Sequence, residues 1–122
     1  MIKILIVEDA GRSMWTLQNF ISYQGYSDVE ATSCEVALDI IESASIDLIL
    51  LNGALATRED CDFEKRLAAM HREDIPVIHM VDYQSSNESS TRIEIAKPFS
   101  MKALKLEIEN AIEFRLYRRA IA

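Results

Sequence analysis

Four polar side chains at the ends of apolar runs could take part in chemistry, and they are Glu8, Asp9, Asn52 and Lys97. The two adjacent carboxylates carry full negative charges, which a lysine can neutralise in an ion pair. The amide of Asn52 carries no full charge and is a poor nucleophile. These residue types therefore favour binding and charge pairing over covalent catalysis.

The rest of the sequence shows no pattern typical of an enzyme. It contains no nucleophile–base pair, no glycine-rich phosphate loop and no cluster with metal-ligand spacing. We therefore do not expect an enzyme. His79 is predicted to be a strand residue and Asp82 a loop residue, and neither is expected to be a ligand.

The composition of the chain excludes several other classes of protein. Its 122 residues fit one domain, residues 1–122, and its net charge of −7 opposes direct binding to nucleic acid. No apolar stretch approaches the ~18 residues of a membrane span, and the start of the chain is not a signal peptide. Cys34 and Cys61 lack metal-ligand spacing and are expected to be reduced thiols, which indicates a cytoplasmic protein.

Strand-like and helix-like segments alternate along the chain. Apolar runs rich in β-branched residues predict strands, and apolar residues at helical spacing predict helices. The expected strands are Ile2–Val7, Asp28–Thr32, Asp47–Leu51, Pro76–Val81 and Ile93–Ala96. The expected helices are Gly11–Gln24, Cys34–Ser43, Glu59–His71 and Ser100–Arg119, with Gly25 ending the first and Ser100 capping the last.

This alternation predicts an α/β fold, a doubly wound five-stranded parallel sheet with helices on both faces. Sheets of this kind place their functional groups at the carboxyl ends of the strands, beside the topological switch point. Glu8, Asp9, Asn52, Val81 and Lys97 should therefore lie along one edge of the sheet.

The chain resembles the receiver domain of bacterial two-component response regulators over nearly its whole length. The resemblance rests on the segments ILIVED, IDLILLN, IPVI and KPF, of which KPF at its distance from the acidic pair is the most specific. It implies the flavodoxin-like, CheY-like strand order 2-1-3-4-5. It also implies phosphorelay signal transduction, in which an Asp accepts a phosphoryl group beside Mg²⁺.

Carried over residue by residue, the resemblance retains the charged part of this site. Glu8 and Asp9 match the acidic pair that holds Mg²⁺, and Lys97 matches the lysine that contacts the phosphoryl oxygens. Two interpretations of the pair stay open: a weak Mg²⁺ site, or solvent-exposed acids that pair with the lysine. No cofactor beyond weakly bound Mg²⁺ is implied.

The phosphoacceptor and both switch positions depart from the family pattern. Asn52 stands at the phosphoacceptor, Val81 at the Thr or Ser after the fourth strand, and Glu94 at the switch aromatic. An amide removes one negative charge, valine lacks the hydroxyl, and a glutamate resists burial where an aromatic ring would lie. In the resulting pocket we expect Asn52 to hydrogen-bond to Lys97.

The connection between the fourth and fifth expected strands is short and polar. Its sequence, DYQSSNESSTR over residues 82–92, has no apolar stripe after Tyr83. A parallel crossover needs a dozen or more residues, most often with a helix. We therefore expect the fourth helix of the family to be absent or shortened, which would expose surface around Ile93, Ile95 and the last helix.

Two surfaces are candidates for a protein partner, which the resemblance implies to be a histidine kinase, a phosphotransfer domain or an output domain. One is Trp15 on the first helix, predicted to face water opposite Leu17 and Ile21. The other is the face formed by residues 93–119, which could also bind a second copy in a homodimer.

The leading hypothesis is an atypical receiver, a pseudo-receiver, that acts by protein–protein contact without aspartyl phosphorylation. The alternative is a conventional phosphoacceptor receiver that carries an Asp-to-Asn change at position 52. Val81, Glu94 and the short crossover favour the first hypothesis. The dipeptide Asn52-Gly53 adds a further hypothesis, because deamidation would restore a carboxylate there, although Gly53 is more simply explained as serving the turn.

Overall fold

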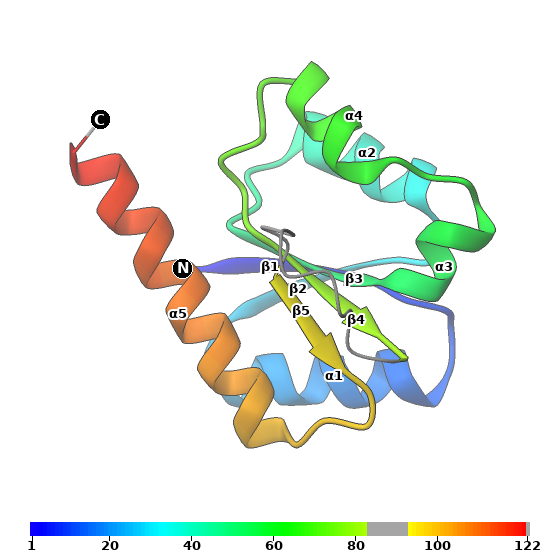
Figure 1. The fold of residues 1–122 in the computed structure, drawn as a ribbon. Helices are drawn as coiled ribbons and strands as arrows, with labels where there is room; N and C mark the ends of the chain where they lie inside the picture. The colour runs from blue at the N-terminus through cyan, green and yellow to red at the C-terminus, as the bar shows by residue number, and fades with distance from the viewer. Residues whose placement is uncertain (83–92, 122) are drawn as a thin grey trace.

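Five short strands form one parallel sheet in the order β2-β1-β3-β4-β5, as the sequence predicts. The strands are β1 (Lys3–Val7), β2 (Ser27–Ala31), β3 (Leu48–Asn52), β4 (Val77–Val81) and β5 (Ile93–Ala96). This computed structural model describes residues 1–82 and 93–121 (Figure 1). The central strands β1 and β3 are almost wholly buried, because helices cover both faces of the sheet.

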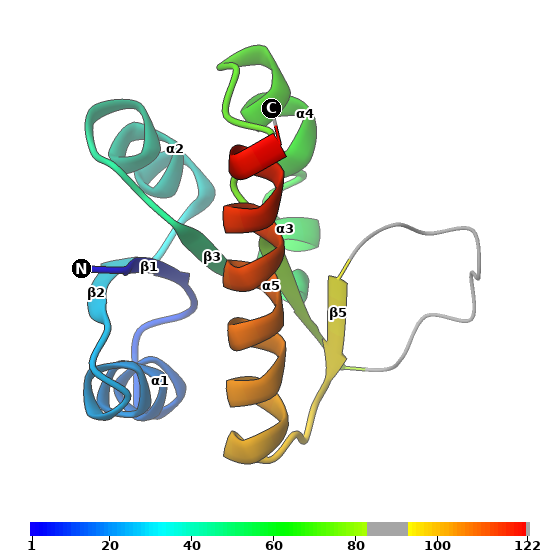
Figure 2. The ribbon, with the colours of Figure 1, turned by 90° about the vertical axis from the view of Figure 1, so that its left-hand side faces the viewer.

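The helices divide between the two faces of the sheet. They are α1 (Arg12–Tyr23), α2 (Cys34–Ser43), α3 (Gly53–Arg58), α4 (Phe63–Ala69) and α5 (Met101–Ile121). Helices α1 and α5 cover one face, and α2, α3 and α4 cover the other (Figures 1 and 2). Within residues 1–82 and 93–121, no helix combines the length and the apolar composition that spanning a bilayer requires.

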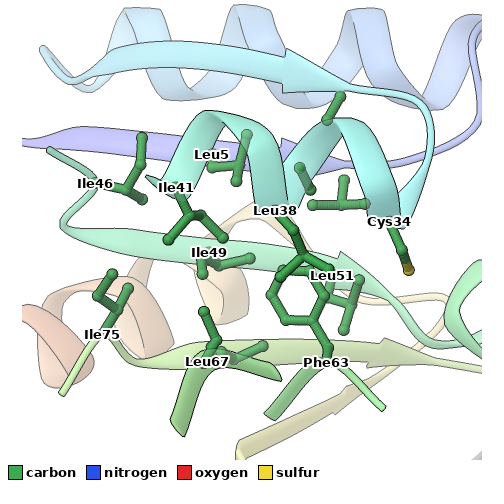
Figure 3. Close-up of a cluster of buried hydrophobic side chains, with 14 of the residues drawn as sticks. Leu5, Cys34, Leu38, Ile41, Ile46, Ile49, Leu51, Phe63, Leu67 and Ile75 are labelled. Atoms are coloured by element: carbon green, nitrogen blue, oxygen red, sulfur yellow. The ribbon is translucent and has the colours of Figure 1, made fainter. Parts of the chain in front are cut away.

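Each face of the sheet has its own hydrophobic core, because successive side chains of a strand point to opposite faces. Leu5 and Leu51 belong to the core beneath α2 and α4 (Figure 3). Ile4 and Leu50 belong to the core beneath α1 and α5. The two cores hold β1 and β3 in a parallel register, so that the carboxyl ends of these strands meet at one edge.

Most predicted elements are confirmed, and α2 and β5 have the predicted bounds. Gly25 follows α1 with a φ of 89°, the conformation of a glycine that ends a helix. The hydroxyl of Ser100 accepts a hydrogen bond from the backbone N–H of Ala103 at 3.0 Å and so caps α5, as expected.

The single helix predicted over Glu59–His71 is wrong at its start. The predicted helix corresponds to α4, which begins only at Phe63, after a turn in which Asp60 has a φ of 50°, and the short helix α3 before this turn was not predicted. Each helix has its own cap: the amide oxygen of Asn52 caps α3, and Asp62 Oδ1 accepts from the Lys65 N–H at 3.3 Å at the start of α4. Asn and Asp are strong N-caps, and here Asn52 starts a helix that was not predicted, whereas Asp62 sets the start of α4.

The expected loss or shortening of a helix between β4 and β5 concerns residues 83–92, which lie outside the described residues. That expectation therefore stays a prediction. The related expectation of exposed surface at Ile95 is wrong, because this side chain is only 8% exposed and packs in the core beneath α5.

Candidate functional site

The carboxyl ends of the strands bring three of the expected polar side chains together. Glu8 follows β1, Asn52 ends β3 and Lys97 follows β5. The Lys97 Nζ lies 3.8 Å from Glu8 Oε2, and the side chain of Asn52 contacts Glu8 directly. The parallel topology thus gathers groups that are distant in sequence into one charged cluster, as doubly wound sheets do.

Asn52 is buried, and both ends of its amide have partners. Its Oδ1 accepts hydrogen bonds from the backbone N–H groups of Ala54 at 2.9 Å and Leu55 at 3.2 Å. Its Nδ2 donates to Glu8 Oε1. Only the oxygen can accept the two backbone hydrogen bonds, so the NH₂ group is the end that meets Glu8. The partner of this NH₂ group is Glu8 and not Lys97, which corrects the sequence-based expectation.

Glu8 is a buried carboxylate, only 3% exposed. Its Oε1 accepts a second hydrogen bond, from the backbone N–H of Asp9 at 2.9 Å, and its Oε2 faces Lys97. Burial of a charge is costly unless such partners compensate it. Glu8 therefore pairs with Lys97, as the ion-pair interpretation expects, but it is buried and not solvent-exposed, whereas Asp9 is exposed.

Asp9 has a cationic partner that sequence analysis missed. The Nη2 of Arg58, in the last turn of α3, lies 2.7 Å from Asp9 Oδ1, and both side chains are more than half exposed. The next residue, Glu59, points elsewhere and accepts a hydrogen bond from the backbone N–H of Cys34 at 2.8 Å, at the start of α2. The sequence held no signal for this pair beyond the N-cap Asn52, which marks the start of the helix that carries Arg58.

The two switch positions lie on β4 and on the edge strand β5. Val81 ends β4 and is half-buried beside the start of α3, where its Cγ1 would lie 3.2 Å from a Cβ atom added at Gly53. Glu94 is half-buried in β5 and pairs in register with His79. Paired residues of parallel strands share a face, so Glu94 points toward the side of the sheet that α2, α3 and α4 cover.

His79 is a strand residue, as predicted, but the sequence did not reveal its partner. It is buried in β4, and its Nε2 lies 2.5 Å from Oε1 of Glu64 on α4. Both residues line a cavity of about 500 Å³, whose wall comes from β3, β4, α3, α4 and the turn between these two helices. Its lining residues do not include Glu8 or Lys97, so the cavity is separate from the charged cluster.

Cys34 and Cys61 are distant in sequence but meet in the structure. Cys34 begins α2 inside the core, Cys61 lies in the turn between α3 and α4, and both are free cysteines that pack in the core beneath α2 and α4. Burial, and next the neighbouring Cys61 thiol, raise the pKa of Cys34, and burial raises the pKa of Cys61 above its ordinary value of 9.0. Both are therefore neutral thiols at neutral pH.

The strand order and the acidic and lysine side chains at the carboxyl edge define a receiver-type signalling domain. Residues 4–109 match the family model of the response regulator receiver domain. The chain belongs to this family and is a receiver domain of two-component response regulators with a CheY-like fold. Domains of this family are signalling modules that interact with kinases and output domains.

Three relatives illustrate the match. Sporulation initiation phosphotransferase F of Bacillus subtilis (strain 168) is 30% identical over 109 residues, which are 84% of this chain and 87% of that protein. A CheY-like response regulator receiver domain protein from Methanospirillum hungatei JF-1 has a TM-score of 0.80 and 21% identity, over 97% of this chain and 98% of that one. The receiver domain of a sensor histidine kinase from Pseudomonas aeruginosa PAO1, with a magnesium ion coordinated in its active site cleft, has a TM-score of 0.78 and 20% identity, over 91% and 97% of the two chains. The last two likenesses concern the fold alone.

Proposed function

We propose that this chain is a cytoplasmic, non-enzymatic pseudo-receiver that signals through protein–protein contacts without aspartyl phosphorylation. The observation that carries the proposal is the hydrogen bonding of Asn52, at the position of the family's phosphoacceptor. Attack on phosphorus needs a nucleophile with charge and an available lone pair. Asn52 has no full charge, its oxygen caps α3, and its NH₂ group donates to Glu8.

The two switch positions support the same proposal. Val81 has no hydroxyl with which to hydrogen-bond a phosphoryl group at the end of β4. Glu94 holds a half-buried carboxylate where the family has an aromatic ring that turns inward. A ring can exchange between a buried and an exposed position at low cost, whereas full burial of a carboxylate is expensive. In this proposal, Val81 and Glu94 therefore cannot transmit a change at position 52 to the surface of the edge strand β5.

The second candidate function is a conventional phosphoacceptor receiver with an Asp-to-Asn change at position 52. The retained cluster of Glu8, Asp9 and Lys97 favours it, because phosphoryl transfer relies on these charges for positioning and neutralisation. The relative from Bacillus subtilis, which is named a phosphotransferase, favours it as well. The two candidates differ in what restoring a carboxylate at position 52 would do.

The test is incubation of the chain with a small phosphodonor and Mg²⁺, followed by intact-mass measurement. We expect the wild type to gain no phosphoryl group, and a stable phosphorylated species would contradict the proposal. The matched variant is Asn52→Asp. If the chain is a pseudo-receiver, the wild type and Asn52→Asp should bind the partner with equal affinity. The second candidate instead requires that Asn52→Asp is phosphorylated and that phosphorylation changes its affinity for the partner.

Two exposed surfaces are the proposed contact sites for a kinase, a phosphotransfer domain, an output domain or a second copy of the chain. Trp15 on α1 is 65% exposed, in agreement with its predicted orientation opposite the buried Leu17. Leu106 and Tyr117 are exposed on α5, at a spacing that places them on one side of the helix, opposite the core residue Leu104. Aromatic and aliphatic side chains of this kind are typical anchors of protein interfaces.

The α5 surface is tested first with the chain itself as partner. Sedimentation or light scattering gives the oligomeric state of the wild type and of the double variant Leu106→Glu, Tyr117→Glu. The control is Val36→Glu, an exposed apolar side chain on α2, across the sheet from α5. If a dimer forms through α5, the double variant is monomeric and the control stays dimeric. A monomeric wild type excludes the second copy and leaves heterologous partners for this surface.

A further inference from the structure

We infer that the carboxylates of Glu8 and Asp9 are satisfied by the chain itself, through the hydrogen-bond donor of Asn52 and the positive charges of Lys97 and Arg58, and that this site holds its shape without a divalent cation. This inference deepens the proposed function. It rests on that proposal in one respect, because it takes asparagine, and not aspartate, as the functional residue at position 52. It differs from what the family implies, because Glu8 and Asp9 match the acidic pair that holds Mg²⁺ in receiver domains.

The first step concerns the contact between Asn52 and Glu8. The Oδ1 of Asn52 caps α3, so the other end of the side chain meets Glu8 Oε1. With an aspartate at position 52 the same geometry would bring two carboxylate oxygens together, and two like charges at that distance repel unless a cation lies between them. The NH₂ group replaces this repulsion with a hydrogen bond, so the contact requires no cation.

The second step concerns the two remaining carboxylate contacts. Lys97 Nζ lies 3.8 Å from Glu8 Oε2, and Arg58 Nη2 lies 2.7 Å from Asp9 Oδ1. Each acidic side chain thus has a basic partner from this chain, and the formal charges of the four groups cancel. A divalent cation entering this cluster would meet little net attraction, since the Coulomb energy of entry depends on the uncompensated charge.

The third step tests whether the residues fit Mg²⁺. Magnesium requires oxygen ligands in near-octahedral geometry, and an amide NH₂ group is a donor that cannot ligate it. In the described part of the chain, no three His, Cys, Asp or Glu side chains are arranged to hold a metal ion. To bind, Mg²⁺ would have to break the Asn52–Glu8 hydrogen bond and displace Arg58 from Asp9. The residues present therefore do not fit the ion.

The experiment compares thermal unfolding with and without MgCl₂, at ionic strength matched with NaCl. The variants are Asn52→Asp, which restores the carboxylate, and Arg58→Gln, which frees Asp9. The matched control is Arg66→Gln, because Arg66 forms a similarly exposed ion pair with Glu35 at 3.2 Å, outside the pocket. We expect the midpoint of the wild type and of the control to be independent of Mg²⁺, and that of Asn52→Asp to fall without Mg²⁺ and recover with it.

A second measurement keeps the inference testable if Asn52→Asp fails to fold. Paramagnetic Mn²⁺ broadens NMR signals close to its binding site, here the amide signals of Glu8 and Asp9. We expect no selective broadening in the wild type and selective broadening at Glu8 and Asp9 in Arg58→Gln, because this variant leaves Asp9 without its basic partner. If Asn52→Asp folds, it should show the same broadening, because it adds a carboxylate beside Glu8.

Two results would overturn the inference: a wild-type midpoint that rises with Mg²⁺ as much as that of Asn52→Asp, or selective Mn²⁺ broadening at Glu8 in the wild type. These results leave the proposed function intact as long as the phosphodonor adds no phosphoryl group. Conversely, phosphorylation of the wild type would refute the proposed function even if the midpoint is independent of Mg²⁺. The two failures are therefore distinguishable.

Discussion

Arg115 on α5 donates a hydrogen bond to Asp47, directly before β3, with 2.9 Å between Nη1 and Oδ1. The arginine is only 8% exposed, and its Nη2 also lies 3.1 Å from Asp74 Oδ2. Asp47 in turn accepts a hydrogen bond from the backbone N–H of Lys3. One guanidinium group thus ties the C-terminal half of α5 to the amino ends of β1 and β3.

Replacement of Arg115 by alanine should lower the free energy of unfolding by about 2–3 kcal/mol, less than for a fully buried pair because the two aspartates are partly exposed. Both variants remove the buried Nε, which has no hydrogen-bond partner, but Arg115→Met should lose less because it keeps the apolar stem. Urea denaturation measures both. The control Arg66→Ala, at an exposed ion pair, should change stability by ~0.5 kcal/mol or less. Equal losses of stability for Arg115→Ala and the control would show that the contacts of Arg115 with Asp47 and Asp74 do not stabilise the fold.

Gly53 is required by its close approach to β4. A Cβ atom there would lie 3.2 Å from both the carbonyl oxygen of Met80 and Cγ1 of Val81. Gly53→Ala should therefore cost about 1–2 kcal/mol in chemical denaturation, as overpacking does. The neighbouring exposed variant Ala54→Ser serves as control and should stay within ~0.5 kcal/mol of the wild type. A neutral Gly53→Ala would show that β4 moves away at no cost.

Deamidation at Asn52-Gly53 should be slow in the folded chain. The reaction needs the backbone nitrogen of Gly53 to attack the Asn52 amide carbon, and the amide is held by hydrogen bonds to Ala54, Leu55 and Glu8. Peptide mass measurement after ageing should show a one-dalton shift that accumulates faster in urea than in native buffer. Equal rates in both conditions would mean that the fold gives no protection.

The two thiols should make the chain less stable in alkaline solution. Because the pKa values of Cys34 and Cys61 are raised in the folded state, unfolding releases thiol protons once the pH passes their ordinary value of 9.0. The stability that they contribute is fully present below that pH and is lost as the pH rises above it. Denaturation at ~pH 8 and ~pH 10 should show a smaller drop for Cys61→Ala than for the wild type. An unchanged drop would assign the effect to other groups, such as Tyr26, whose pKa is also raised by burial.

The sequence was sufficient for the fold, because its signals are local and redundant. The apolar run of β1 is too continuous for a half-exposed strand, and the Gly25 and Ser100 signals mark helix ends by backbone chemistry alone. Helix α3 was missed and α4 was predicted to start too early, because the apolar stripe of Phe63 and Leu67 indicates a helix but not where it begins, and the caps Asn52 and Asp62 were not considered.

The site was predictable in its members but not in its pairing. Strand ends identify Glu8, Asn52 and Lys97, yet periodicity does not say which side chain reaches which. The contact of Arg58 with Asp9 joins residues 49 positions apart and depends on the turn of a helix that was not predicted. The pairing of His79 with Glu64 likewise depends on how α4 lies across β4, which only tertiary packing decides.

Arg58 and Glu59 brace the end of α3 in two directions. One is joined to Asp9 beyond β1, and the other to the first turn of α2 through the N–H of Cys34. The two contacts lie on different sides of the α3 end, so a movement of this end toward one partner lengthens its contact with the other partner. Because both anchors are parts of the chain itself, the end of α3 is held between β1 and α2 by contacts that need no bound ligand.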